Sequence, residues 1–144
     1  MNQNKENINK LVVNIFNNIM QEEENALIVG EFKNISVNDM HIIEAIGMDE
    51  PKNMSKIASI LNITVGTLTI AINNLLKKGY VVRRRSEKDR RVVFISLSEL
   101  GDRAYEHHKR YHEKIVKRLT EDLDDEEVAV LQKALDHMAE KLEK

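Results

Sequence analysis

The chain has 144 residues, of which 42% are hydrophobic and 32% are charged, and its net charge at pH 7 is −2. This composition is typical of a globular protein and differs from that of a disordered or membrane protein. The absence of cysteine excludes disulfides, thiolate nucleophiles and cysteine metal sites. The first ten residues are polar, and no apolar run approaches the roughly 18 residues of a membrane span. We therefore expect a cytoplasmic protein that forms a single domain over residues 1–144.

Two helices are predicted at the start of the chain. Apolar residues at three-four spacing between Ile8 and Met20 form one wide helical stripe. A second helix is predicted from about Ser36 to Met48, because Ser36 is a favourable N-cap and Asp39 can complete the first turn. Gly47 is placed to end this helix.

Two shorter helices follow, and a tight turn joins them. Asn53 can cap the first, which ends at Leu61, and Thr64 can cap the second, which continues to Lys78. Residues 62–63 form the turn, and Gly79 is placed to end the second helix. This order is that of a helix-turn-helix, in which the second helix enters the major groove of DNA. Its exposed face supplies the candidate DNA contacts Thr64, Gly66, Thr67, Thr69, Ile70, Asn73 and Asn74.

The residue types on this face indicate a base preference. Gly66 permits close approach to DNA, Thr67 can bond to a base or a phosphate, Ile70 can contact thymine methyl groups, and Asn73 can pair with adenine. We therefore expect an A·T-rich palindromic operator in double-stranded DNA. The alternative is the polar side of an ordinary surface helix, and that alternative leaves an exposed Ile70 unexplained.

A β-hairpin is predicted next, with strands at Tyr80–Arg85 and Val92–Leu97 around a polar connection. From Lys77 to Arg91 there are eight basic residues and two acidic ones. Such a patch on an otherwise acidic chain is typical of a surface that binds phosphates, although a solvated charged loop has the same composition. Asp89 can hold Arg91 by a charge-assisted bond, directed at the minor groove. The hairpin supplies the candidate DNA contacts Arg84, Lys88, Asp89, Arg90 and Arg91. Arg84 is interpreted, together with Arg83 and Arg85, as a phosphate contact or a hairpin-face charge.

Two helices complete the chain. Ser98 with Glu99 opens the first, which runs to about Asp122, and Asp124 caps the second. The fold class is therefore mainly α with a small β-hairpin wing. In this winged helix-turn-helix, residues 30–99 form the DNA-binding part. Residues 1–29 and 100–144 carry more apolar surface than that part covers, and we interpret them as dimerisation helices of a homodimer. Closure of one compact core by the same helices is the alternative.

The segment from Gly66 to Gly101 resembles the MarR family of winged-helix repressors. The resemblance is carried by Thr67 and Thr69, by the run Leu75–Gly79, by Asp89 with Arg91, and by the run Leu97–Gly101. Within that family the chain is most similar to FabT-type repressors of fatty-acid synthesis genes. The motifs of that likeness are IFNN, FKNIS, DMH, TVGT, KKGY and RSEKDRRVV, at residues 15–18, 32–36, 39–41, 64–67, 77–80 and 85–93. The resemblance implies transcription regulation near fatty-acid biosynthesis genes, with acyl-acyl carrier protein or a small-molecule ligand as co-repressor.

The histidines leave two interpretations open. His108 and His112 are four residues apart on one helical face, a spacing that can place two imidazoles on one metal ion. Zinc-responsive MarR regulators use histidines in similar places together with a glutamate of the first helix, here Glu23 or Glu24, with His41. The other interpretation makes these histidines hydrogen-bonded pocket or interface residues, with no cofactor. The candidate effector pocket comprises Phe16, Met20, Phe32, Met40, His41, Met48, His108 and Tyr111, although such apolar residues are also ordinary core residues.

An enzyme is not expected. The sequence has no phosphate-binding glycine loop, no Ser-His-Asp arrangement and no recognisable pair of catalytic carboxylates. A purely helical interaction protein is the remaining alternative, and it would leave the arginine-rich hairpin without a role.

Overall fold

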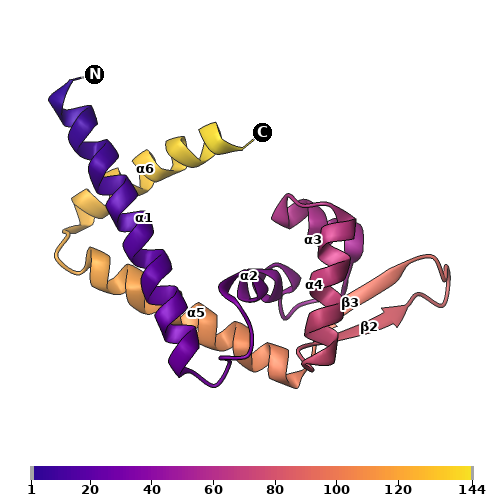
Figure 1. Ribbon diagram of the computed structural model, residues 1–144. Helices are drawn as coiled ribbons and strands as arrows, with labels where there is room; N and C mark the ends of the chain where they lie inside the picture. The colour runs from indigo at the N-terminus through magenta and orange to yellow at the C-terminus, as the bar shows by residue number, and fades with distance from the viewer. Residues whose placement is uncertain (1, 144) are drawn as a thin grey trace. The chain divides into compact units, whose positions relative to one another are not determined.

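The computed structural model describes residues 2–143, with the backbone alone for residues 27–29. The chain forms two compact units, which divide between Glu106 and His107. In chain order the elements are α1 (Gln3–Val29), α2 (Val37–Ile46), β1 (Lys52–Asn53), α3 (Met54–Leu61), α4 (Val65–Lys77), β2 (Val81–Arg85), β3 (Val93–Leu97), α5 (Glu99–Thr120) and α6 (Asp125–Leu142) (Figure 1). This order confirms the predicted winged helix-turn-helix and adds β1, which the sequence pattern did not indicate.

The helices begin at the predicted caps. The Ser36 hydroxyl accepts from the Asp39 amide at 3.0 Å, and the Asp39 carboxylate accepts from the Ser36 amide at 3.1 Å, which forms a reciprocal capping box. Asn53, Thr64 and Asp124 each accept from the amide three residues later. Each cap of this kind contributes about 1 kcal/mol to stability. The caps therefore set where α2, α3, α4 and α6 begin.

Asn62 makes the turn of the helix-turn-helix. It adopts a left-handed conformation with φ 56° and ψ 46°, which asparagine tolerates better than most residues. The two helices that flank it are bent by 106° relative to each other. Gly79 ends the motif with φ 84°, as expected of a glycine one residue beyond a helix cap.

The core of the first unit lies beneath α4. Leu68, Ile72 and Leu75 of α4 are at most 1% exposed. They belong to one cluster that also includes residues of α2, α3 and both hairpin strands. The other members of this cluster that are less than 2% exposed are Met40, Ile42, Ile43, Ile46, Ile57, Tyr80, Ile95 and Ala104. Because these side chains interlock from several elements, α4 is held in place along its whole inner face.

The hairpin belongs to a three-stranded antiparallel sheet of order β1-β3-β2. In the short strand β1, Lys52 pairs with Ile95 and Asn53 with Phe94. Asn53 also caps α3, so one residue connects the sheet to the helix-turn-helix. The Lys52 ammonium donates to the carbonyl of Ile46 at 2.6 Å and therefore also closes the end of α2.

The base of the hairpin meets the first turn of α5. The Ser98 hydroxyl donates to the Gly79 carbonyl at 2.6 Å and accepts from the Gly101 amide at 3.1 Å. A Cβ atom on Gly101 would lie 2.1 Å from the carbonyl oxygen of Tyr80. This separation is far too short for any side chain, so position 101 requires glycine.

The outer helices carry exposed apolar residues. On α1 these include Ile8, Leu11, Val12, Ile15 and Phe16, all of which are about half exposed or more. In the second unit, α6 has no buried residue, and Val130, Leu135, Met138 and Leu142 are exposed. Among the described residues, no single helix has the length and hydropathy to cross a membrane. The bent pair α3 and α4 meets that criterion only when its two helices are counted together.

Candidate nucleic-acid interface

The outer face of α4 carries the residues predicted to read DNA. Burial of Leu68 and Ile72 turns Gly66, Thr67 and Ile70 outward, since residues one or two positions away on a helix point elsewhere. Ile70 is 75% exposed, the largest exposed fraction of any apolar residue on this helix. Asn73 and Asn74 are exposed as well. The predicted exposure of this face is therefore confirmed, whereas contact with DNA stays a prediction.

The threonines of α4 have different hydrogen-bonding roles. The Thr64 hydroxyl accepts from the Thr67 amide at 3.1 Å and donates to the Thr67 hydroxyl oxygen at 2.9 Å. This arrangement leaves the Thr67 hydroxyl proton to donate outward, to a base or a phosphate. The Thr69 hydroxyl instead donates to the carbonyl of Val65 at 2.8 Å, so its proton is used within the helix.

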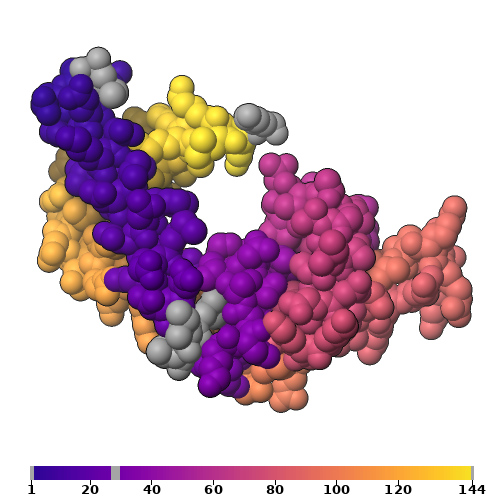
Figure 2. Space-filling model, in the orientation of Figure 1, coloured from indigo at the N-terminus to yellow at the C-terminus, as the bar shows by residue number. Residues whose placement is uncertain are grey.

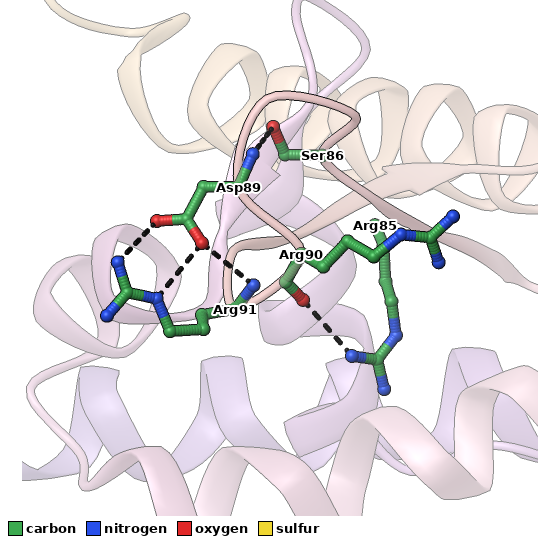
Figure 3. A network of polar contacts seen from close by, with 5 residues as sticks. All are labelled: Arg85, Ser86, Asp89, Arg90 and Arg91. Carbon is green, nitrogen blue, oxygen red and sulfur yellow. Dashed lines mark hydrogen bonds and ion pairs between the residues drawn. The ribbon is translucent and has the colours of Figure 1, made fainter.

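The hairpin projects from the first unit as a narrow ribbon beyond α4 (Figure 2). At its tip, the Arg91 guanidinium donates twice to Asp89, each time at 3.1 Å, and the Arg91 amide donates to the same carboxylate at 3.0 Å (Figure 3). The predicted bond between these two residues is therefore confirmed. The Arg91 side chain is 92% exposed, and its remaining N–H groups point away from Asp89. The bonds from Arg91 hold the pKa of the Asp89 carboxyl below its ordinary value.

Backbone contacts also shape the tip. The Arg85 guanidinium donates to the carbonyl of Arg90 at 3.1 Å, and the Ser86 hydroxyl accepts from the Asp89 amide at 3.3 Å (Figure 3). Lys88 and Arg90 are exposed. Three of the five predicted hairpin contacts, Lys88, Arg90 and Arg91, therefore lie within one tight turn with their charges in solvent.

The two faces of β2 direct its arginines differently. Arg83 pairs with the buried Ile95 and lies on the face toward α4, where its guanidinium donates to the Asn73 side-chain oxygen at 3.1 Å. Arg84 pairs with Phe94 and lies on the opposite face, beside Glu50. Sequence reasoning grouped these arginines as charges. The alternation of side chains along a strand is the one sequence signal that could place Arg83 and Arg84 on opposite faces. The contact of Arg83 with Asn73 depends in addition on how the strand packs against α4.

A groove of about 390 Å³ separates the hairpin from α4. Its apolar lining includes Met54, Ile72 and Val93, and its polar lining includes Asn73 with Arg83. The groove therefore joins the predicted major-groove contacts of α4 to the positive charge of the hairpin.

Comparison with known proteins identifies the family. Residues 35–93 match the MarR family. A crystal structure of Streptococcus pneumoniae FabT in complex with DNA is 38% identical, covers 96% of both chains, and superposes with a TM-score of 0.91. The chain belongs to the MarR family. Its fold and relatives are those of transcriptional regulators and not of enzymes.

Two curated relatives of this MarR chain match only in part. HTH-type transcriptional regulator SarZ of Staphylococcus aureus (strain USA300) is 45% identical over 60 residues, which are 42% of this chain and 40% of that protein. The uncharacterized HTH-type transcriptional regulator YhjH of Bacillus subtilis (strain 168) is 27% identical over 89 residues, which are 62% of this chain and 51% of that protein. The chain thus spans about half the length of the curated relatives it matches.

The predicted effector residues of this MarR chain lie in different surroundings. Phe32 and Met40 are at most 2% exposed and belong to the core. Phe16, Met20 and Met48 are exposed. His41 is in the first unit, and its side chain is 47% exposed. His108 and Tyr111 belong to the second unit.

The histidines form two local pairs. In the first unit, the His41 ring lies 3.3 Å from the Glu23 carboxylate. Glu23 is buried and Glu24 is exposed, because residues adjacent on a helix point about 100° apart. The structure thus places Glu23, and not Glu24, beside His41. In the second unit, the Nε2 atoms of His108 and His112 lie 2.9 Å apart.

Proposed function

We propose that this protein is a transcriptional repressor that binds an A·T-rich palindromic operator as a homodimer. The outer face of α4 carries this proposal, because it presents Thr67, Ile70 and Asn73 to solvent beside an arginine-rich ribbon. An exposed isoleucine between polar residues suits thymine methyl groups, and an exposed arginine at a ribbon tip suits a minor groove. The similarity to a FabT bound to DNA supports the same assignment.

The exposed apolar residues of α1 and α6 support the proposed homodimer. Continuous apolar stripes of this kind are uncommon on the surface of a monomer and mark association surfaces. A twofold dimer would place two α4 helices about 34 Å apart, which is one turn of DNA. We expect sedimentation to give twice the mass of one chain, and a stable monomer would contradict the proposal.

The regulated genes are proposed to be those of fatty-acid synthesis, and the co-repressor an acyl-acyl carrier protein. This part derives from the resemblance to FabT-type repressors. The exposed Phe16, Met20 and Met48 are the candidate contacts for an acyl chain, since buried Phe32 and Met40 already fill the core. A co-repressor strengthens repression only if it binds the DNA-competent shape of the dimer more tightly than the other shape.

A gel-shift titration tests the proposal. Duplex DNA from upstream of fatty-acid genes is compared with coding DNA of equal length, with acylated and with unacylated carrier protein. We expect retention of the upstream duplex alone and tighter binding with the acylated carrier only. Loss of binding in the paired variant Thr67→Ala with Asn73→Ala, but not in Lys133→Gln on α6, would assign the binding to α4. Equal retention of both duplexes would contradict the proposal that the protein binds a specific operator. If acylation of the carrier protein does not change the affinity for DNA, only the proposed co-repressor is wrong.

A second candidate function is regulation by a transition metal. The observation in its favour is the pair His108 and His112, whose Nε2 atoms are close enough to share one ion. The test is metal analysis of protein purified without a histidine tag, followed by gel shifts with chelator for the wild type and His112→Gln. If neither the chelator nor the substitution changes DNA binding, this function is excluded.

A further inference from the structure

The side-chain amide of Asn73 is held by the wing. The Arg83 Nη1 atom donates to the Asn73 Oδ1 atom at 3.1 Å, across ten residues of sequence. Arg83 is the central residue of β2 and pairs with Ile95, which is fully buried. The guanidinium therefore extends from the hydrogen-bonded part of the ribbon and not from its tip. Because Arg83 is itself fixed in the sheet, its hydrogen bond gives the Asn73 amide a defined orientation.

The chemistry of the two groups fixes which amide atom faces which way. A guanidinium has only donors, so the atom of Asn73 that it meets must be the oxygen. The Asn73 amino group then points away from Arg83. Asparagine reads adenine with both atoms, because its oxygen accepts from the adenine amino group while its amino group donates to N7. Because Arg83 occupies one of the two lone pairs of the Asn73 oxygen, the amino group is the part of the amide whose hydrogen-bonding capacity is wholly open to DNA.

We propose that Arg83 is a positioning residue that makes Asn73 a hydrogen-bond donor toward DNA and so sets the base preference at one position of each half-site. The inference depends on the proposed function, since it requires α4 to lie in the major groove. The edges that suit a donor are those of thymine, through O4, and guanine, through O6 and N7. Cytosine, which offers a donor there, is rejected. Adenine keeps both of its bonds only if its amino group reaches the one oxygen lone pair that Arg83 leaves open. This differs from the adenine contact that the sequence suggested for Asn73.

Arg84 provides a matched control on the same strand. It lies on the opposite face of β2, next to Glu50 and Phe94, and so does not face Asn73. Removal of either arginine lowers the positive charge of the ribbon by one, but only removal of Arg83 releases the amide of Asn73. A change in base preference thus separates positioning from simple attraction to phosphate.

The experiment selects binding sites from a randomised duplex library. The proteins compared are the wild type, Arg83→Ala, Arg83→Gln, Arg83→Lys, Arg84→Gln, and Arg83→Ala in an Asn73→Ala background. Lysine keeps a donor for the Asn73 oxygen, whereas glutamine both donates and accepts and therefore lets the amide turn over. Thermal unfolding of each variant verifies that the fold is intact, and Arg83→Gln keeps most of the side chain should Arg83→Ala unfold.

We expect the alanine and glutamine variants at position 83 to lose discrimination of thymine or guanine against adenine by roughly fivefold or more at one symmetric position. Arg83→Lys should retain it, Arg84→Gln should weaken all sites equally, and the Asn73→Ala background should remove any further effect of Arg83→Ala. If Arg83→Ala weakens every site equally and leaves the selected sequence unchanged, Arg83 contacts phosphate only and the inference is wrong. If the wild type itself selects no sequence, the proposed function fails, which is a distinguishable result.

Discussion

The recognition helix α4 and the tip of the hairpin are both predicted to contact DNA, but different forces hold them. The inner face of α4 is fixed by side chains that are at most 1% exposed, whereas the tip is fixed by hydrogen bonds and an ion pair in solvent. Apolar burial contributes several kcal/mol per residue to stability, and an exposed ion pair contributes about 1 kcal/mol or less. Stability and DNA affinity should therefore respond to different substitutions in the two regions.

The largest effect is expected from the inner face of α4. Leu68→Ala should lower the free energy of unfolding by about 2–5 kcal/mol, because it opens a cavity in a closed core. Urea denaturation, monitored by circular dichroism, measures this change. Ile70→Ala, on the outer face of the same helix, is the control and should change unfolding by less than about 0.5 kcal/mol. Equal losses for the two variants would contradict the inner and outer assignment.

Arg91→Ala should show the opposite behaviour. We expect DNA affinity to fall by roughly 1–3 kcal/mol, since a base-edge or groove contact is lost, while the urea midpoint stays unchanged. Fluorescence anisotropy at two salt concentrations measures the affinity. Lys133→Gln on α6 controls for the loss of one positive charge. Unchanged affinity of Arg91→Ala would count against the wing as a DNA contact.

Gly66→Ala should move stability and affinity in opposite directions. A Cβ at this position meets only the Thr64 hydroxyl oxygen, at 3.9 Å, so alanine fits and raises helix stability by up to about 1 kcal/mol. The same Cβ would stand between the first turn of α4 and the DNA and weaken binding. The two titrations described above measure both quantities. Tighter binding by this variant would show that position 66 is not where the helix approaches DNA most closely.

The smallest effect concerns pH. Because Arg91 holds the pKa of Asp89 below its ordinary value of 3.8, the ion pair is fully formed above that value and is lost only as the pH falls through the lowered pKa. We expect the NMR signal of the Arg91 Nε–H group to stay constant from pH 8 to pH 5. The signal should change only below the pH at which an ordinary aspartate titrates. A transition between pH 5 and 7 would contradict the ion pair of Arg91 with Asp89.

The features that the sequence predicted are those that neighbouring residues determine. The caps at Ser36, Asn53 and Thr64 each join a side chain to an amide three residues away, and Asp89 with Arg91 spans two residues. Such bonds form in whatever tertiary structure the segment adopts, so the residue pattern alone indicates them. The side of α4 that faces the core was predictable for the same reason, because the spacing of apolar residues along a helix determines it.

The features that the sequence did not predict depend on packing. Strand β1 has two residues, Lys52 and Asn53, neither of which favours strands, and it exists because β3 offers it a free edge. The contacts of Arg83 with Asn73 and of Glu23 with His41 join different elements, and their geometry is set by how those elements meet. Phe32 and Met40 could line a pocket or fill the core on residue type alone, and only the structure places them in the core.

The close approach at Gly101 brings the first turn of α5 directly against the backbone at the base of the hairpin. A Cβ at position 101 would lie 2.1 Å from the Tyr80 carbonyl oxygen, so any residue other than glycine would push the first turn of α5 away from the backbone that leads into β2 at Val81. We therefore expect substitutions at position 101 to disturb the hairpin as well as α5.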